Sequence, residues 1–353
     1  MILVLGLCAL LWGIGSLMGA PRSARLSMIG VLYLGVVGLH LVLPTGHPLR
    51  LATGETAALW LLIGGFAALV LAYRAVLLRL RSRAETGEAQ SVDTKDRPLF
   101  NETELNRYAR HMVLREIGGP GQKKLKQARV LVIGAGGLGA PALQYLAAAG
   151  VGTIGVIDDD TVENTNLQRQ VIHRDGSIGM PKVFSAQQEM EAQNPYVTVR
   201  PYNRRLTGDV AAALFAEYDL VLDGTDNFDT RYLVNETAVA AGLPLISGAL
   251  SQWEGQLSVF DPARGAPCYQ CVFEAAPAPE LAPSCAAAGV LGPLPGVIGA
   301  MMGVEAVKII TGAGTPLRGQ MVIYDALYGE SRTIMVQRRD TCPACSAVQA
   351  KAS

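Results

Sequence analysis

The sequence predicts an α/β protein: a doubly wound sheet with a structural zinc site, preceded by three transmembrane helices. Only four of its 30 Lys and Arg and 30 Asp and Glu residues lie in residues 1–73. Strand-like and helix-like runs alternate after residue 98, which is typical of a doubly wound sheet. Two Cys-x-x-Cys pairs follow in the C-terminal quarter. A formal net charge of zero excludes a general electrostatic attraction to nucleic acid.

Three stretches near the N-terminus contain no Asp, Glu, Lys or Arg: residues 1–21, 26–43 and 56–73. Each is close to the roughly 20 apolar residues that cross a bilayer as a helix. A secretory signal peptide is an alternative for the first stretch, but it requires basic residues that do not precede Arg22. A buried helical hairpin of a soluble domain is another. The pattern favours a membrane anchor over residues 1–83.

Arginine positions predict how the anchor is oriented. Arginines lie between the first two stretches and after the third, whereas Arg50 in the second loop is opposed by Glu55. The positive-inside rule then places the segments after the first and third stretches in the cytoplasm. We therefore expect a multi-pass protein of the cytoplasmic (inner) membrane. A polar linker is expected over residues 84–98, and a folded domain facing the cytoplasm over residues 99–353.

A glycine-rich turn opens the folded domain. Strand-like residues 129–133 lead into Gly134-Ala135-Gly136-Gly137-Leu138-Gly139 and an Ala-rich helical stretch, and a second strand ends at Asp158. In such a Rossmann-like unit, glycines let the backbone approach phosphate at a helix N-terminus, and the acid accepts hydrogen bonds from ribose hydroxyls. These residues predict a nucleotide site but do not separate NAD, FAD and ATP, so an NAD-dependent oxidoreductase stays open.

Further polar residues after the acid favour ATP. Asn166 and Arg169 lie in a Asn-Leu-Gln-Arg-Gln run, Lys182 follows, and Asp226 lies just after a strand at residues 220–223. Arg and Lys offset triphosphate charge and Asp can hold Mg²⁺, whereas a dehydrogenase needs no such set. Taken singly, each has an ordinary alternative: an Asp160–Arg169 surface ion pair, a solvated Lys182, or a helix cap at Asp226.

Together these motifs resemble the ubiquitin-activating-type adenylyltransferases of bacteria, the HesA, MoeB and ThiF family. The Arg-Tyr-Ala-Arg-His run ending at His111, the glycine turn, the Asn-Leu-Gln-Arg-Gln run and the cysteine pairs all match. The resemblance implies that Asp158 holds the ribose and Asp226 holds Mg²⁺. It also implies a homodimer in which Arg110 reaches the nucleotide of the partner subunit. The residues implied to contact phosphates are Asn166, Arg169 and Lys182.

The implied reaction is ATP-dependent adenylylation of the C-terminal glycine of a ubiquitin-like sulfur-carrier protein, which releases pyrophosphate. A terminal carboxyl, with a pKa of roughly 3.5, is already ionised at neutral pH, so no general base is required. The favoured carrier is the small subunit of molybdopterin synthase, and the carrier of the thiamine pathway is the alternative. Because the chain ends soon after Cys345, without the rhodanese domain of some relatives, a separate sulfur donor is expected.

The cysteines provide an independent signal. Cys268, Cys271, Cys342 and Cys345 form two pairs that suit a tetrahedral structural Zn²⁺ site. Disulfides are the alternative, but a cytoplasmic domain keeps its thiols reduced. Cys285 stands apart, and some eukaryotic relatives form a thioester with their substrate through a cysteine in the corresponding loop. That role requires an accessible thiol with a lowered pKa.

Overall fold

The structure is a computed structural model that describes residues 2–19, 21–44, 46–54, 56–89, 99–277 and 288–348. It consists of two compact units, Met1–Arg97 and Pro98–Ser353, each with its own internal packing. The predicted thioester cysteine, Cys285, lies outside the described residues.

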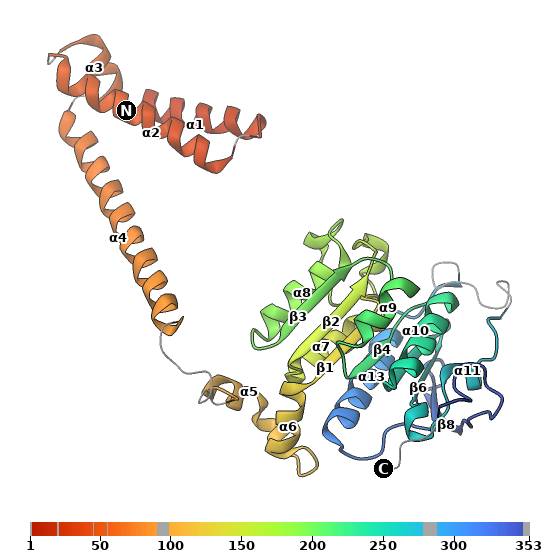
Figure 1. Ribbon diagram of the computed structural model, residues 1–353. Helices are drawn as coiled ribbons and strands as arrows, with labels where there is room; N and C mark the ends of the chain where they lie inside the picture. The colour runs from red at the N-terminus through yellow and green to blue at the C-terminus, as the bar shows by residue number, and fades with distance from the viewer. Residues whose placement is uncertain are drawn as a thin grey trace. The chain divides into compact units, whose positions relative to one another are not determined.

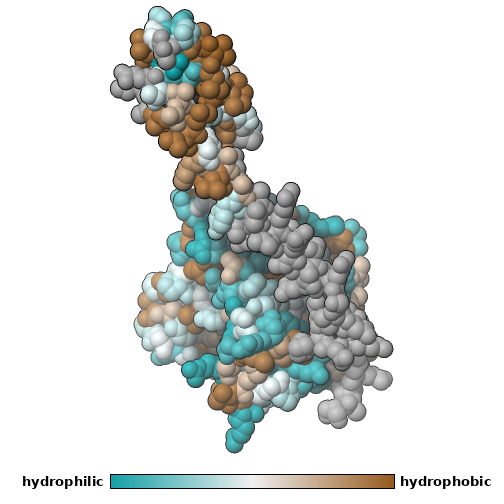
Figure 2. All heavy atoms as spheres, turned by 90° about the vertical axis from the view of Figure 1, so that its left-hand side faces the viewer, coloured by the Kyte–Doolittle hydropathy of each residue, from teal (hydrophilic) through white to brown (hydrophobic). Residues whose placement is uncertain are grey.

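The N-terminal unit is helical. Its helices are α1 Ile2–Leu17, α2 Arg22–Val42, α3 Pro48–Thr53 and α4 Ala57–Ala89. A small cluster of Val4, Val36 and Trp60 is buried between α1, α2 and α4. Figure 2 shows apolar side chains over most of the visible face of this unit, a surface suited to a lipid environment.

Length and composition distinguish the apolar helices. Residues 24–42 of α2 and 57–74 of α4 are long and apolar enough to cross a membrane. Helix α1 has 16 residues, about 24 Å at the helical rise, which is short of a hydrocarbon core of about 30 Å. The three predicted spans are therefore represented by two full-length candidates and one shorter apolar helix. Helix α4 also continues into the predicted linker, because Ala and Glu are good helix formers.

The C-terminal unit is built on a sheet in which the described strands follow the order β3-β2-β1-β4-β5-β6-β7-β8. Strands β1 to β5 are parallel, and β6 to β8 are antiparallel. The strands are β1 Arg129–Ile133, β2 Thr153–Asp158, β3 Thr198–Asn203, β4 Leu220–Asp223, β5 Leu245–Leu250, β6 Glu254–Phe260, β7 Gln320–Asp325 and β8 Glu330–Met335. This arrangement confirms the predicted α/β sheet.

Helices cover both faces of the sheet (Figure 1). The helices of this unit are α5 Glu102–Met112, α6 Gly118–Gln127, α7 Gly139–Ala149, α8 Lys182–Gln193, α9 Gly208–Phe215, α10 Phe228–Ala241, α11 Tyr269–Val272 and α13 Pro293–Thr311. One apolar core joins the sheet to α7, α8 and α13, and a second joins it to α9, α10 and α11. Although α13 is long and apolar enough to span a membrane, half of it is buried within this unit.

The strand order determines where a ligand can bind. It reverses between β1 and β4, because the chain runs outward from β1 to β3 and then returns to the other side of β1. In open α/β sheets, ligands bind at the carboxyl ends of the strands beside this reversal. The loops after β1, β2 and β4 are therefore the expected walls of a site.

Candidate functional site

A cavity of about 820 Å³ lies at the carboxyl ends of these strands. It brings together most of the residues that the sequence singles out, although they are up to 92 positions apart. The predicted residues that line it are Gly134, Gly136, Gly137, Asp158, Arg169, Lys182 and Asp226. Two others lie directly behind the lining: Asn166 contacts Arg169, and Gly139 begins helix α7.

The glycine turn is tightly packed against its own backbone. Gly134 has φ of 91°, a conformation that side-chain-bearing residues rarely adopt. A Cβ on Gly139 would lie 1.9 Å from the carbonyl oxygen of Gly134. The turn therefore requires glycine at these positions. It presents backbone and the start of α7 to the cavity, an arrangement that suits an anion.

Asp158 ends β2 and fixes the turn from the side. Its Oδ2 accepts a hydrogen bond from the Ala135 amide at 2.7 Å, and its Oδ1 accepts one from the Asp160 amide at 2.8 Å. Burial raises the pKa of the Asp158 carboxyl, while the nearby Lys182 ammonium and these two amides act in the opposite direction. The acid is thus held at the cavity edge by backbone donors.

The two cations that the sequence predicts for the cavity, Lys182 and Arg169, each have an acceptor in the chain. Lys182 is buried at the start of α8, and its Nζ donates to Asp160 Oδ2 at 2.6 Å. Arg169 donates to Asn166 Oδ1 at 2.9 Å. The alternatives considered from the sequence are wrong for these residues, because Lys182 is not solvated and Asp160 pairs with Lys182 instead of Arg169.

Asp226 lies in the loop between β4 and α10. Its side chain is exposed at the cavity, and no described residue hydrogen bonds to it. The helix cap is its neighbour, because Asn227 Oδ1 accepts a hydrogen bond from the Thr230 amide at 2.9 Å. The capping alternative for Asp226 is therefore wrong. Its carboxylate is free to face a ligand.

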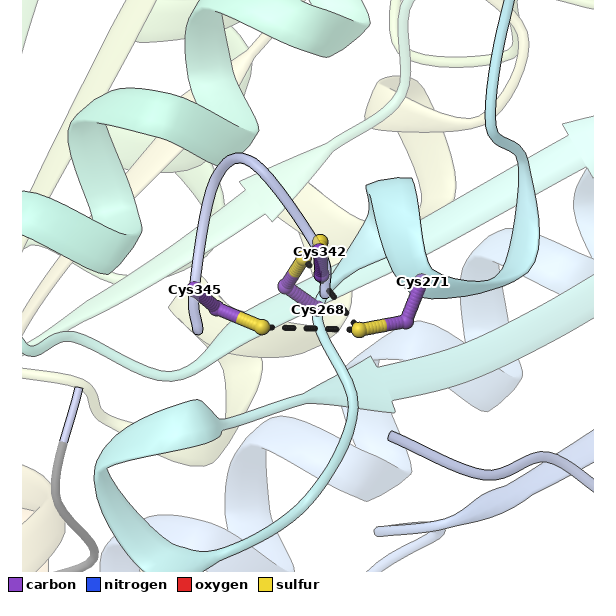
Figure 3. Close-up of side chains that lie close together, drawn as sticks. All are labelled: Cys268, Cys271, Cys342 and Cys345. Carbon is purple, nitrogen blue, oxygen red and sulfur yellow. Dashed lines mark hydrogen bonds between the residues drawn. The ribbon is translucent and has the colours of Figure 1, made fainter. Parts of the chain in front are cut away.

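The four paired cysteines converge on one point (Figure 3). The Sγ atoms of Cys268 and Cys342 are 3.5 Å apart, those of Cys271 and Cys345 are 3.4 Å apart, and all four lie within 4.8 Å of one another. All four are free thiols, so the disulfide alternative is wrong. A tetrahedral zinc with Zn–S distances of about 2.3 Å separates its sulfurs by about 3.8 Å. The buried tetrad fits such an ion.

Comparison with known proteins decides the family. The ThiF family model matches residues 108–344. The chain belongs to the ThiF family. This confirms the resemblance inferred from the motifs.

Among the relatives, a Thermus thermophilus protein named sulfur carrier protein adenylyltransferase is 48% identical over 250 residues, covering 70% of this chain and 92% of that protein. The Mycobacterium tuberculosis adenylyltransferase/sulfurtransferase MoeZ is 50% identical over 243 residues, or 68% of this chain and 62% of MoeZ. This chain therefore spans less than two thirds of MoeZ.

A solved structure of Escherichia coli MccB with AMPCPP and MccA shares the fold. It superposes with a TM-score of 0.61 and 24% identity, and the match covers 69% of this chain and 75% of MccB. At this identity the likeness concerns the fold alone.

Within this ThiF-family site, the sequence did not single out Arg231 on α10. Its guanidinium is buried and donates to Gly248 O at 2.8 Å, to Ser247 Oγ at 3.1 Å and to Thr225 O. It also lies 3.6 Å from a carboxylate oxygen of the buried Asp223. Arg231 therefore fixes the loop that carries Asp226. Its position three residues into a helix gave no sign of this role.

His173 is a second residue whose role emerges only in three dimensions. Its Nε2 donates to the carbonyl of Ala135 in the glycine turn at 2.9 Å, and its Nδ1 lies 2.9 Å from Ser185 Oγ. Burial lowers the pKa of the His173 imidazole, so the ring is held neutral. Neutral His173 therefore supports the turn from behind and does not line the cavity.

Arg110 is the predicted site residue that the structure places elsewhere. It is exposed near the end of α5 and does not line the cavity of its own chain. The helix is firmly attached: Asn101 and Glu104 form a capping box at its start, Glu104 pairs with Lys126, and Tyr108 accepts from Asn194 at 2.8 Å. Any role of Arg110 at a nucleotide therefore requires a second molecule.

Proposed function

We propose that this protein transfers the adenylyl group of ATP to the C-terminal glycine carboxylate of a ubiquitin-like sulfur-carrier protein. The products are an acyl-adenylate and pyrophosphate. The observation that carries the proposal is the cavity in which a glycine turn, the acid Asp158 and the cations Arg169 and Lys182 converge in a ThiF-family chain. The name of the Thermus thermophilus relative supports it. The relatives reported above are named for adenylyl transfer, which favours this activity over an NAD-dependent oxidoreductase.

The residues of the cavity meet the main difficulty of the reaction, which is charge. A carboxylate that is already ionised must approach the α-phosphate of a polyanion. The turn and the start of α7 offer backbone N–H groups to the phosphates, and Lys182 and Arg169 offer positive charge. Asp158 lies where ribose hydroxyls would donate to it. Binding and charge compensation, without a general base, account for these residue types.

Mg²⁺ fits the acidic part of the cavity. Carboxylate oxygens are the donors that this ion prefers, and Asp226 presents one that has no partner among the described residues. The carboxylates of Asp158, Asp159 and Asp160 also lie within 4.8 Å of one another. When bound, the ion would neutralise phosphate charge. We assign Asp226 as its principal ligand.

Three further parts of the proposal concern assembly. The buried cysteine tetrad holds a structural Zn²⁺ that ties the loop around α11 to the segment near the C-terminus. A homodimer supplies Arg110 to the partner's cavity. Residues 1–83 anchor the protein in the cytoplasmic membrane, residues 84–98 are a linker, and the catalytic domain, residues 99–353, lies on the cytoplasmic side.

The carrier that we favour is the small subunit of molybdopterin synthase, with the thiamine-pathway carrier as the alternative, and a separate protein donates sulfur. The test is carrier-dependent exchange of pyrophosphate into ATP by the purified full chain. Exchange is expected with a carrier that ends in Gly-Gly and not with the same carrier lacking its last glycine. Comparing the two carriers identifies the substrate. A folded, zinc-loaded dimer that exchanges with no Gly-Gly carrier would refute the proposal.

The same assay tests whether the catalytic domain, residues 99–353, is active without the N-terminal residues. Every proposed phosphate and metal residue lies in the unit Pro98–Ser353, which is compact by itself. Residues 99–353 alone are therefore expected to retain carrier-dependent exchange. A folded segment without exchange, beside an active full chain, would show that the N-terminal unit takes part in the reaction.

A further inference from the structure

Gln170 is a polar residue of the cavity that the proposed reaction leaves without a role. We infer that Gln170 binds the nucleotide, by donating a hydrogen bond from its side-chain amide to a phosphate oxygen of ATP. The inference rests on the proposed use of ATP and adds a residue to that site.

The first observation is an unsatisfied amide. The Gln170 side chain is buried, with 4% of its surface exposed, yet its Oε1 has no hydrogen-bond partner in the part of the chain that the structure describes. No described residue hydrogen bonds to its Nε2 either. The backbone is nevertheless well held, because the Gln170 amide donates to Asn166 O and its carbonyl accepts from the His173 amide, both at 3.0 Å. The chain fixes this residue in place and leaves its side-chain amide without a partner.

The second observation is the direction of the side chain. Gln170 lines the cavity, and its Nε2 lies 3.8 Å from where a Cβ on Gly136 would be. The donor end of the amide therefore faces the glycine turn, where the phosphates are expected.

The neighbouring polar side chains, unlike that of Gln170, have hydrogen-bond partners within the chain. Arg169 is bonded to Asn166, and Lys182 is bonded to Asp160. Among these groups, only Gln170 Nε2 has no acceptor among the described residues, so its N–H groups are free for a ligand. The buried Oε1 is an acceptor that a phosphate oxygen does not satisfy, so its cost to stability is the same with and without the nucleotide. A primary amide adds donors without adding charge, and a phosphate oxygen is a strong acceptor.

The chain contains a matched control. Gln122 on α6 is also buried and also has an Oε1 without a partner, but its Nε2 donates to Ala149 O at 2.8 Å. It does not line the cavity. Replacing each glutamine by methionine keeps the length of the side chain and removes the amide. The two substitutions then differ in whether the amide has a partner within the chain.

The experiment measures two quantities on the full chain and on each variant. One is the affinity for α,β-methylene-ATP with Mg²⁺, by titration calorimetry, and the other is the unfolding temperature without nucleotide. Gln170→Met is expected to weaken binding of the analogue at least about tenfold, the order of a lost hydrogen bond to a charged group. Its unfolding temperature should be equal to or above that of the wild type. Gln122→Met should show the reverse: lower unfolding temperature and unchanged affinity.

Each other outcome decides against the inference. A Gln170→Met protein that binds the analogue as the wild type does, or one that fails to fold, would assign Gln170 a structural role or none. A second variant, Gln170→Asn, keeps the amide on a shorter side chain and should recover part of the affinity lost in Gln170→Met; no recovery would contradict an amide contact. Wild-type protein that does not bind the analogue at all would overturn the proposed function itself, together with this inference.

Discussion

The glycine turn provides the sharpest quantitative test of the site. In Gly139→Ala, the new Cβ would lie 1.9 Å from Gly134 O and 2.9 Å from Gly134 C. Real Cβ atoms essentially never approach other heavy atoms within 3.0 Å. Both sides of this contact are backbone, so no side chain can rotate away. The turn and the first residue of α7 must therefore separate by about 1 Å.

A displacement of this size has two expected effects. Overpacking of this kind costs about 1–3 kcal/mol of folding stability. A displacement of about 1 Å in groups that position a substrate costs on the order of 100-fold in rate. Because the turn is the predicted phosphate contact, we expect pyrophosphate exchange to fall by about two orders of magnitude while the protein remains folded.

The assay compares exchange rate and unfolding temperature with those of Gly208→Ala. A Cβ on Gly208, the first residue of α9, would meet only Leu233, at 4.0 Å, and Gly208 does not line the cavity. This control should retain both exchange and stability. If Gly139→Ala exchanges within a few-fold of the wild type, the turn does not position the phosphates and the reasoning is refuted.

Three further predictions follow from the cysteines, His173 and the dimer. Cys342→Ser should unfold the catalytic unit, because structural zinc contributes directly to folding; a zinc-free variant of undiminished stability would contradict the site. Burial lowers the pKa of His173, so the unfolded chain takes up a proton more readily than the native one, and urea stability should fall as pH drops below about 6.5. His173→Gln should lose less stability between about pH 7.5 and about pH 5 than the wild type. Arg110→Ala and Asp226→Ala homodimers should both be inactive, whereas mixing them should restore roughly a quarter of wild-type exchange through heterodimers with one complete site. Subunits that exchange partners without recovering activity would exclude an Arg110 that acts across the interface.

The fold could be predicted because its signals are local in sequence. The turn from Gly134 to Gly139 lies between a strand and a helix, and Asp158 ends the next strand, so one βαβ unit is readable without any long-range information. The cysteine pairs are also local signals, because the two cysteines of each Cys-x-x-Cys motif are close in sequence. Only the contact between the first pair and the second pair depends on the fold. These patterns therefore predict which residues belong to the nucleotide and zinc sites and in which order they occur along the chain.

The partners of these residues could not be predicted, because they depend on contacts between distant segments. Nothing in the sequence distinguishes Gln170 from Gln168 in the same motif; the first is buried in the cavity and the second is exposed. Arg231 resembles any charged residue of a helix until Gly248 and Ser247 on β5 are placed beside it. Such roles arise because the order of the strands in the sheet differs from their order in the sequence, so residues that are distant in sequence become neighbours.

The pairing of Lys182 with Asp160 shows why such contacts matter for function. The Lys182 side chain is only 6% exposed, so a nearby negative group must offset its charge at all times. Asp160 supplies that group, but its own side chain is 66% exposed, and its carboxylate can return to water at little cost. In the proposed reaction, a phosphate that contacts Lys182 would replace the Asp160 carboxylate and would not have to bury a new ion pair. In the proposed site, Lys182 is therefore already paired, with an exposed carboxylate, before ATP binds.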